Sequence, residues 1–267
     1  MKLLFSEYKS DYDHYVFPYA VWAIPEAGET PAMIFARGFL PSSRNFERFY
    51  LCRHVRVDLG QFSPSSENRR ILRKCSGVTY RLLPSHEFEY TSGWRKFCKT
   101  YADIKFGKDV MTYQRLDSLF HSKIVSHILL FTDTEAEKDV GLTTLYLEER
   151  QLAYYYYAFY DLNYYDRNLG MFMMTSAVQY FAEAGYDYLY LGTCYSRNAL
   201  YKTQFRGAEF FNGFRWSRDL KELKYMIARD QSTVKTHLIE TDEYRQKFYG
   251  GRLDPIVAAS EFALPLE

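Results

Sequence analysis

The sequence predicts an α/β (α+β) fold in which a mixed sheet carries helices on both faces and follows a smaller α+β region. Three observations support this prediction. Strand and helix patterns alternate through the second half of the chain, a Tyr-rich run lacks any helical period, and a Gly-containing turn leads into an amphipathic helix. We expect two domains: a basic N-terminal region over residues 1–115 and a larger domain over residues 116–267.

The composition is that of a globular protein. Of 267 residues, 47% are apolar and 25% are charged, which is enough to bury a core. No apolar run reaches the ~18 residues that cross a bilayer, so we expect no membrane association, and the N-terminus becomes polar too early for a signal peptide. The four cysteines form no Cys-x-x-Cys pair, which favours a reducing cytoplasm over a disulfide framework. They are Cys52, Cys75, Cys98 and Cys194.

Positive charge is concentrated in one part of the chain. The net charge is +1, but between Arg37 and Lys108 there are 15 Lys and Arg against 6 Asp and Glu, a net charge of +9. This asymmetry indicates a surface that faces a polyanion, with a solvated basic face as the alternative.

A predicted helix carries much of this charge. Ser65 or Ser66 can cap its start, and at 100° per residue its four cations fall within about 140° of arc, with Ile71 and Leu72 on the other side. These cations are Arg69, Arg70, Arg73 and Lys74. A second basic helix is expected at about residues 87–106.

The second half of the chain alternates between strands and helices. Residues 151–161 lack helical period and predict a strand buried on both faces. Residues 169–184 predict a helix with one apolar face, closed by Gly185. We also expect strands over 124–132, 141–147 and 186–191, a polar turn over 163–167, a short helix near 198–203, strands near 209–216 and helical structure over 218–250.

The turn Arg167-Asn168-Leu169-Gly170 joins the Tyr-rich strand to the following helix. This order resembles the core of the GNAT acyltransferases. The resemblance implies that two central strands separate after the turn and that open N–H groups at the helix start hold an anionic or carbonyl group. Phe172 stands where GNAT enzymes usually have a second small residue, which counts against a coenzyme A pyrophosphate site.

A longer set of motifs resembles the aminoacyl-tRNA–protein transferases, the arginyl- and leucyl-transferases of the N-degron pathway. The matching stretches lie in the same order, from about residue 38 to residue 209. They are Gly38-Phe39, Cys52 to Val57, Phe62 to Arg70, Tyr160-Asp161, Arg167 to Gly170, Tyr188 to Gly192, and Leu200-Tyr201-Lys202 with Phe205-Arg206 and Glu209. The chain departs from the family in lacking its N-terminal cysteine pair; residues 13–17 stand near that place.

The resemblance implies a GNAT-like transferase domain that moves an aminoacyl group from an aminoacyl-tRNA to the N-terminal amine of an acceptor protein. Because the ester is already activated, it implies no cofactor and no metal. The tyrosines would stack on the terminal adenine, and the cations would hold phosphate or the ester carbonyl. The tRNA-binding candidates are Arg69, Arg70, Arg73 and Lys74; the catalytic candidates are Asp161, Tyr201 and Lys202; the substrate-binding candidates are Tyr160, Arg167, Asn168, Gly170, Tyr190, Gly192 and Glu209.

Each candidate has a plainer alternative. Arg167 can form an ion pair with Asp161 or Asp166, and Asp161 can cap its loop. The tyrosines can pack against their neighbours instead of a base, and we expect His54 to be a surface residue. Two rival functions also remain open: a GNAT N-acyltransferase that uses acyl-CoA, and a non-catalytic relative that binds tRNA or peptide. Nothing in the sequence indicates an oligomeric state, the amino acid transferred or the acceptor residue.

Overall fold

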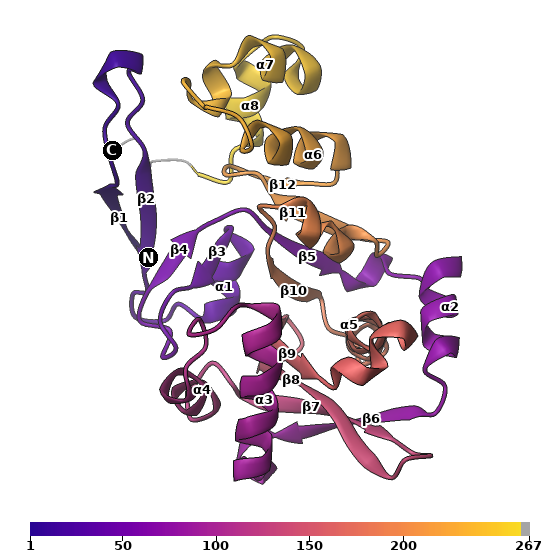
Figure 1. Cartoon of the computed structure of the whole chain (residues 1–267). Helices are drawn as coiled ribbons and strands as arrows, with labels where there is room; N and C mark the ends of the chain where they lie inside the picture. The colour runs from indigo at the N-terminus through magenta and orange to yellow at the C-terminus, as the bar shows by residue number, and fades with distance from the viewer. Residues whose placement is uncertain (263–267) are drawn as a thin grey trace. The chain divides into compact units, whose positions relative to one another are not determined.

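A computed structural model describes residues 1–262, and the chain divides into two compact units (Figure 1). Unit 1 comprises Met1–Val55, Thr193–Gln204 and Ala208–Glu267, whereas unit 2 comprises Arg56–Gly192 and Phe205–Gly207. Each unit therefore joins segments that are distant in sequence. The boundary expected near residue 115 lies inside unit 2 and stays a prediction.

Unit 2 is built on a mixed sheet with the strand order β5-β10-β9-β8-β7-β6. Strands β6 to β9 pair antiparallel in sequence order, whereas β9 and β10 pair parallel. The first two residues of β5 and the last of β10 belong to unit 1. The strands are β5 (His54–Asp58), β6 (Val78–Pro84), β7 (His127–Asp133), β8 (Lys138–Glu148), β9 (Leu152–Tyr160) and β10 (Tyr188–Thr193).

Helices cover both faces of this sheet. Gly141 of β8 faces α5, because a side chain there would meet Met173 at 3.0 Å. Phe159 of β9 faces the other way, with its ring 5.8 Å from Tyr101 of α3 and 6.3 Å from Phe120 of α4. The helices are α2 (Ser66–Lys74), α3 (Ser92–Lys105), α4 (Tyr113–Phe120) and α5 (Leu169–Glu183). The predicted mixed sheet with helices on both faces is confirmed.

The parallel pair β9 and β10 separates along its length. The two strands pair only from Leu152 opposite Tyr188 to Tyr154 opposite Tyr190, while β9 continues to Tyr160 on its β8 side. The turn expected after β9 is a 3-10 helix over Leu162–Arg167, directly before α5. This splayed pair, followed by a turn and a helix, is the GNAT-like arrangement that the sequence predicted.

The helix α5 differs from its prediction in one respect. We expected a single apolar face, but nine of its 15 residues are buried. The reason is that α5 lies against β9 on one side and α2 on another. A helix that is apolar nearly all round is typical of such a sandwiched position.

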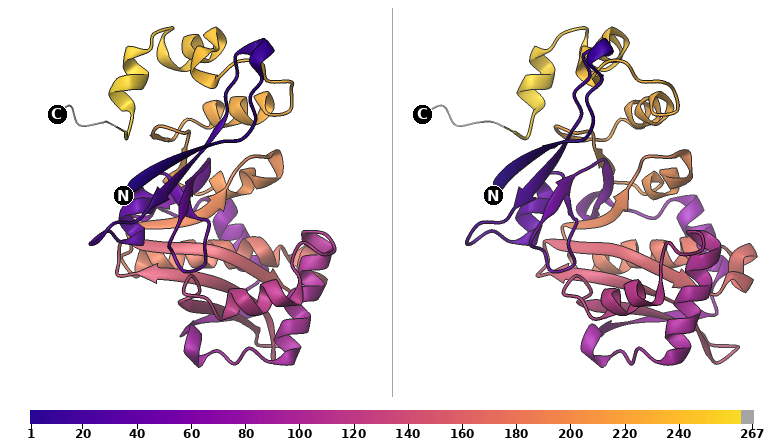
Figure 2. Two further views of the ribbon diagram at one scale, coloured as in Figure 1. Left: turned by 90° about the vertical axis from the view of Figure 1, so that its left-hand side faces the viewer. Right: turned by 60° about the vertical axis from the view of Figure 1, so that its left-hand side comes forward.

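Unit 1 contains a second sheet in the order β1-β2-β4-β3, in which all neighbours pair antiparallel. Its strands β1 and β2 form the long two-stranded ribbon in Figures 1 and 2. The elements of the N-terminal part are β1 (Lys2–Glu7), β2 (Tyr19–Ile24), α1 (Pro31–Ala36), β3 (Phe39–Pro41) and β4 (Phe49–Leu51). Two helices were expected before residue 115; the short helix α1 precedes them and was not predicted.

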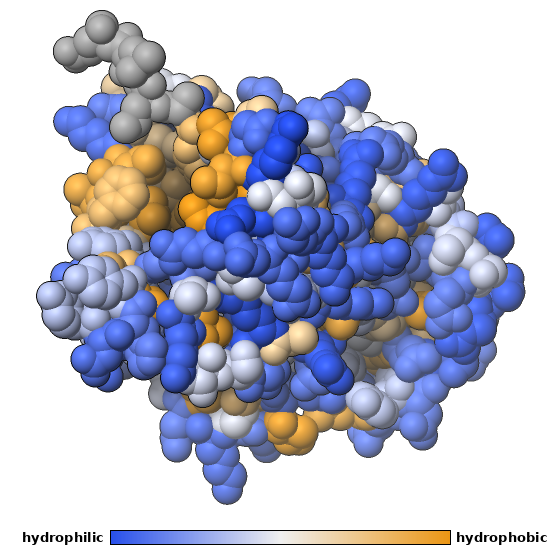
Figure 3. Space-filling model, turned by 90° about the horizontal axis from the view of Figure 1, so that it is seen from above, coloured by the Kyte–Doolittle hydropathy of each residue, from blue (hydrophilic) through white to orange (hydrophobic). Residues whose placement is uncertain are grey.

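The C-terminal part of unit 1 is a hairpin followed by three helices. The hairpin is formed by β11 (Ala208–Phe211) and β12 (Trp216–Ser217), and the helices are α6 (Leu220–Arg229), α7 (Asp242–Tyr249) and α8 (Asp254–Ala259). The face of the molecule seen in Figure 3 is mostly hydrophilic, with a hydrophobic patch. The helix α6 buries Leu223, Met226 and Ile227. The polar helical segment expected over residues 218–250 is two separate helices, α6 and α7, and α6 is amphipathic rather than polar all round.

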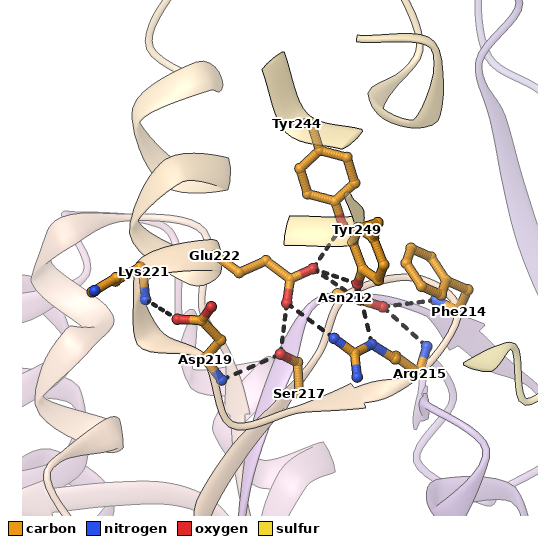
Figure 4. A network of polar contacts seen from close by, with 9 residues as sticks. All are labelled: Asn212, Phe214, Arg215, Ser217, Asp219, Lys221, Glu222, Tyr244 and Tyr249. Carbon is orange, nitrogen blue, oxygen red and sulfur yellow. Dashed lines mark hydrogen bonds and ion pairs between the residues drawn. The ribbon is translucent and has the colours of Figure 1, made fainter. Parts of the chain in front are cut away.

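A buried carboxylate joins these C-terminal elements. Glu222 of α6 is fully buried, and hydrogen bonds reach it from Asn212 after β11 (2.9 Å), Ser217 of β12 (2.6 Å), and Tyr244 (2.6 Å) and Tyr249 (2.9 Å) of α7 (Figure 4). A buried charge is stable only when its hydrogen-bonding capacity is used in this way. The network therefore ties α6 and α7 to the hairpin.

Candidate functional site

The turn before α5 is shaped by two residues with special backbone requirements. Asn168 caps α5 in the left-handed region, at φ 60°, which asparagine tolerates better than most residues. Gly170 is required by close packing, because a side chain there would meet the Tyr160 ring at 2.8 Å. The space beside the first turn of α5 is thus taken by an aromatic ring of this chain.

The sequence suggested that the Phe172 ring lies beside the turn, at the position of a pyrophosphate, but it does not. Its side chain is only 4% exposed, and its ring packs 6.1 Å from that of Phe131 on β7. The ring is therefore part of the core, and the argument against coenzyme A that rested on Phe172 was wrong. The obstruction beside the turn comes instead from Tyr160.

Arg167 forms an ion pair, but with neither of the two carboxylates considered. Its Nη1 lies 3.3 Å from Oδ2 of Asp133, at the end of β7. The same oxygen accepts a hydrogen bond from the hydroxyl of Tyr164, at 2.8 Å. The Tyr164 hydrogen bond is the main reason why the pKa of the buried Asp133 is lowered. Arg167 therefore serves first to complete this local network.

Asp161 occupies the end of β9 as a loop cap. One oxygen accepts the N–H of Asn163 at 3.0 Å, and the other pairs with Lys138 Nζ at 3.0 Å. Burial raises the pKa of Asp161, but these two partners outweigh it and the pKa is lowered. A carboxylate that is engaged in this way is a weak proton acceptor at neutral pH.

The basic helix α2 forms as predicted. Ser65 caps it in a reciprocal capping box with Asn68. All four predicted cations are exposed, whereas Ile71 is buried. They are Arg69, Arg70, Arg73 and Lys74. Arg70 pairs with Glu67 one turn earlier, an exposed contact that contributes little to stability.

Within unit 2, the basic helix α2 contacts the turn that precedes α5. Lys74 Nζ lies 3.4 Å from the carbonyl oxygen of Asp166, and the thiol of Cys75 lies 3.3 Å from that of Arg167. Two predicted features that are almost 100 residues apart in sequence therefore adjoin. The exposed cations of α2 therefore lie beside the turn that precedes α5.

The candidate tyrosines have different environments. Tyr190 is only 2% exposed, and its hydroxyl accepts a hydrogen bond from Arg56 at 3.1 Å, so it cannot stack on a nucleobase without opening the core. Tyr160 is half-buried against Tyr101 of α3, with ring centroids 4.8 Å apart. Tyr201 in unit 1 is 43% exposed and is the candidate most open to a base.

Lys202 lies on a 3-10 helix of unit 1 over Arg197–Thr203. Its Nζ donates to the carbonyl oxygen of Thr193 at 2.8 Å, and burial lowers the pKa of this amine. Gly192, just before Thr193, has φ +82°, which glycine adopts at little cost. Glu209 is buried and accepts a hydrogen bond from Nε of Arg218 at 3.2 Å.

His54 corrects another expectation. We expected a surface residue, but His54 is fully buried, with its ring 5.0 Å from that of Trp216 and Nδ1 hydrogen-bonded to the carbonyl oxygen of Cys52. Burial raises the pKa of the Cys52 thiol to about 12, so this thiol is neutral at physiological pH. All four cysteines are free and buried.

Sequence reasoning missed two features. One is a cavity of about 240 Å³ in unit 2, with aromatic walls and two imidazoles. It is lined by Ser85, His86, Phe88, Tyr90, Phe120, His121, Val125 and Ile128. The other is Arg53 in unit 1, a buried arginine with two unsatisfied nitrogens. The only sequence signal for Arg53 was its place between the matched residues Cys52 and Arg56.

Within residues 1–262, no three His, Cys, Asp or Glu side chains lie together as metal ligands. No helix in that range is long and apolar enough to cross a membrane.

The mixed sheet with its splayed pair, turn and helix defines an acyltransferase-type fold. No family model matches the sequence. The chain is similar to several proteins named aspartate/glutamate leucyltransferase, at 26% identity in each case. The predicted resemblance to the aminoacyl-tRNA–protein transferases is thereby confirmed.

These relatives come from three bacteria. The match to the Chromobacterium violaceum protein spans 168 residues, or 62% of this chain and 68% of that protein. The match to the Ruegeria pomeroyi protein spans 171 residues, or 62% and 61%, and that to the Ruegeria sp. protein spans 186 residues, or 67% and 66%. The chain thus spans about two thirds of their length.

Solved structures of low similarity were also found. L-PGS from Bacillus licheniformis has a TM-score of 0.41 at 14% identity, over 54% of this chain and 46% of that one. FemX has a TM-score of 0.41 at 10% identity, over 53% of each chain.

Proposed function

We propose that this chain is an aminoacyl-tRNA–protein transferase that moves a leucyl group from tRNA to the N-terminal amine of a protein beginning with aspartate or glutamate. The similarity to the aspartate/glutamate leucyltransferases carries the proposal. The adjoining basic helix and turn of unit 2 support it. In this proposal the protein works in the cytoplasm and needs no cofactor, because the ester of the charged tRNA is already reactive.

The exposed face of α2 is proposed as the tRNA-binding surface. Arg73 forms no hydrogen bond or ion pair through its side chain with any residue of the described range, so its charge is fully available. Arg70 can exchange its exposed partner Glu67 for a phosphate at little cost. Phosphate contacts of this kind supply most of the affinity for nucleic acid and weaken as salt rises.

The reaction itself requires little acid–base chemistry. The acceptor nitrogen attacks the ester carbonyl, an amide bond forms, the bond to the ribose oxygen breaks, and that oxygen takes the proton. An α-amine has a pKa of about 8, so about a tenth of it is neutral at pH 7. Positioning is therefore the main task. We propose Lys202 as the donor to the ester carbonyl and Tyr201 as the stacking surface for the terminal adenine, while Asp161 shapes the turn.

One observation favours a second candidate, an N-acyltransferase that uses acyl-CoA. With Phe172 in the core, its ring no longer blocks a pyrophosphate beside α5. The Tyr160 ring against Gly170 is the remaining obstacle. Tight binding of acetyl-CoA, measured by calorimetry, would favour this candidate over the first.

The direct test uses tRNA charged with labelled leucine and peptides that begin with Asp, Glu, Lys or Arg. Label is expected on the peptides that begin with Asp and Glu, and none on the same peptides with acetylated N-termini. tRNA charged with labelled arginine tests the identity of the donor. Tight tRNA binding without transfer to any peptide would instead identify a non-catalytic relative.

The tRNA surface can be tested separately by the salt dependence of binding. Arg73→Ala is expected to reduce the slope of log affinity against log salt by about 1, the value for one lost phosphate contact. Lys235→Ala, which removes an exposed lysine in unit 1, is the matched control and should leave the slope unchanged. An unchanged slope for Arg73→Ala would place the tRNA elsewhere.

A further inference from the structure

Arg53 is a buried arginine whose hydrogen-bonding capacity is only partly used. Its side chain is 9% exposed, and Nη2 pairs with Oδ2 of Asp230 at 2.8 Å. Nε and Nη1 are buried and have no hydrogen-bond partner in the described chain. Leaving a charged donor buried and unpaired is costly, so a group that accepts these hydrogen bonds in a working complex would explain why the residue is arginine.

A second basic side chain, Lys202, contacts the same short segment as Arg53, which is Thr193-Cys194. The carbonyl oxygen of Arg53 accepts the N–H of Cys194 at 2.9 Å, and Lys202 Nζ donates to the carbonyl oxygen of the preceding residue, Thr193, at 2.8 Å. Burial raises the pKa of the Cys194 thiol, while both cations act to lower it. Burial therefore keeps the Cys194 thiol neutral at pH 7, so it places no negative charge beside Arg53.

Tyr195 lies over the guanidinium of Arg53. Its ring centroid is 4.7 Å from the guanidinium carbon, and its hydroxyl accepts the backbone N–H of Arg53 at 2.8 Å. Tyr195 is 47% exposed while Arg53 is buried, so the ring shields the cation from solvent.

We propose that Arg53 binds the side-chain carboxylate of the acceptor's N-terminal aspartate or glutamate once the Tyr195 ring turns aside. This inference rests on the proposed function and assigns its acceptor specificity to named residues. A carboxylate has two acceptor oxygens, which match the two nitrogens of Arg53, Nε and Nη1, that lack a hydrogen-bond partner. Arginine is well suited to this task because it stays charged when buried.

The test compares four peptides that differ only at the first residue: Asp, Asn, Glu and Gln. Binding is measured by calorimetry without tRNA, and transfer is measured as kcat/KM with leucyl-tRNA. Arg53→Gln is expected to weaken binding and transfer for Asp and Glu peptides by about 10- to 100-fold, the loss typical of a hydrogen bond to a charged group. Asn and Gln peptides should change by less than about threefold.

Two further variants keep the test decisive. Asp230→Asn removes the competing carboxylate and should strengthen the preference for Asp over Asn, the opposite of the Arg53→Gln effect. Asp230 is 30% exposed, so this variant tests the site even if Arg53→Gln fails to fold. Arg252→Gln, at an arginine 69% exposed, is the matched control and should leave the preference unchanged.

The outcomes separate this inference from the proposed function. An equal loss for all four peptides, or a change in KM for leucyl-tRNA alone, would overturn the role of Arg53 while leaving the transferase activity intact. Wild-type protein that binds Asp and Asn peptides equally would also overturn it. Absence of transfer by the wild type would instead refute the proposed function, whereas selective peptide binding that depends on Arg53 would still support the site.

Discussion

Unit 1 buries two charged side chains that differ in how their hydrogen-bonding capacity is used. Glu222 is fully buried, and four side chains donate to its two oxygens at 2.6 to 2.9 Å. Arg53 is buried nearly as deeply, but Asp230 accepts from only one of its three guanidinium nitrogens. A buried charge with every partner inside the chain serves the fold. One with unused donors is better explained by a ligand.

The same comparison separates the predicted cations of unit 2. Arg167 was a candidate by motif, yet Asp133 neutralises it and Tyr164 completes the network. Arg73 was one member of a helical stripe, and its charge remains available. A motif indicates where a charge lies in the sequence, whereas its availability depends on neighbours that only the fold supplies.

The largest effect is expected at Glu222. Glu222→Ala leaves the four donors without their acceptor, and we expect a loss of about 3–5 kcal/mol in the free energy of unfolding, as for a broken buried charge network. Urea denaturation followed by circular dichroism measures it. A loss below about 1 kcal/mol would mean that water replaces the carboxylate readily. Glu222 would then contribute no more to stability than Arg53, and the difference between the two buried charges would not hold.

A smaller loss is expected at Asp133, the corresponding carboxylate of unit 2. Asp133→Asn weakens the hydrogen bonds to Tyr164 and to the backbone N–H of Glu135 and Ala136, and we expect a cost of about 1–3 kcal/mol. Thermal unfolding of the purified variant measures it.

The pH dependence at Asp133 follows from the direction of its pKa. The pKa in the folded protein is lowered from 3.8, so the folded state holds the proton less tightly than the unfolded state. Its contribution to stability is complete above the ordinary pKa and is lost as the pH falls from about 4 through the lower folded value. Asp133→Asn should therefore flatten the acid limb of the stability profile; an unchanged acid limb would contradict this account.

Removal of a single donor should cost less. Tyr244→Phe deletes one of the hydrogen bonds to Glu222 and leaves the carboxylate with its other donors. We expect a loss of about 1–2 kcal/mol, measured by urea denaturation. Tyr225→Phe, at the partly exposed ring stacked on Tyr244, is the control and should cost less.

The smallest effect on stability is expected at Arg53. Arg53→Met keeps the stem and removes the unpaired donors, while Asp230 stays partly exposed to water. We expect a change within about 1 kcal/mol, because replacing a poorly satisfied buried charge by an apolar side chain is often neutral. A loss comparable to that of Glu222→Ala would show that Arg53 serves the fold, and it would remove the basis for an acceptor site.

Local features of the fold could be predicted from the sequence with good accuracy. The cap at Ser65 or Ser66, the basic stripe of α2 and the strand, turn and helix over residues 151–184 all depend on residues within one or two turns of one another. The ordered motifs from residue 38 to 209 also indicated the resemblance to the aminoacyl-tRNA–protein transferases, because a set of motifs in one order is more specific than any single motif.

The directions of individual side chains could not be predicted in this way. Phe172 and Tyr190 are buried because the faces of α5 and β10 that carry them pack into the core. Sequence periodicity does not show which side chains point where in a helix or strand that is buried on all sides. His54 is likewise buried by Trp216, which is more than 150 residues away in the chain. Each of these environments is created by tertiary contacts.

The sequence by itself therefore determined the mixed α/β core, the basic helix and the resemblance to aminoacyl-tRNA–protein transferases, since all three are encoded by local pattern and motif order. Only the tertiary structure decided which charges are satisfied. Arg53 meets Tyr195 and Asp230 across 142 and 177 residues of chain. The hydrogen bonds that a buried charge lacks become apparent only when those distant segments are packed together.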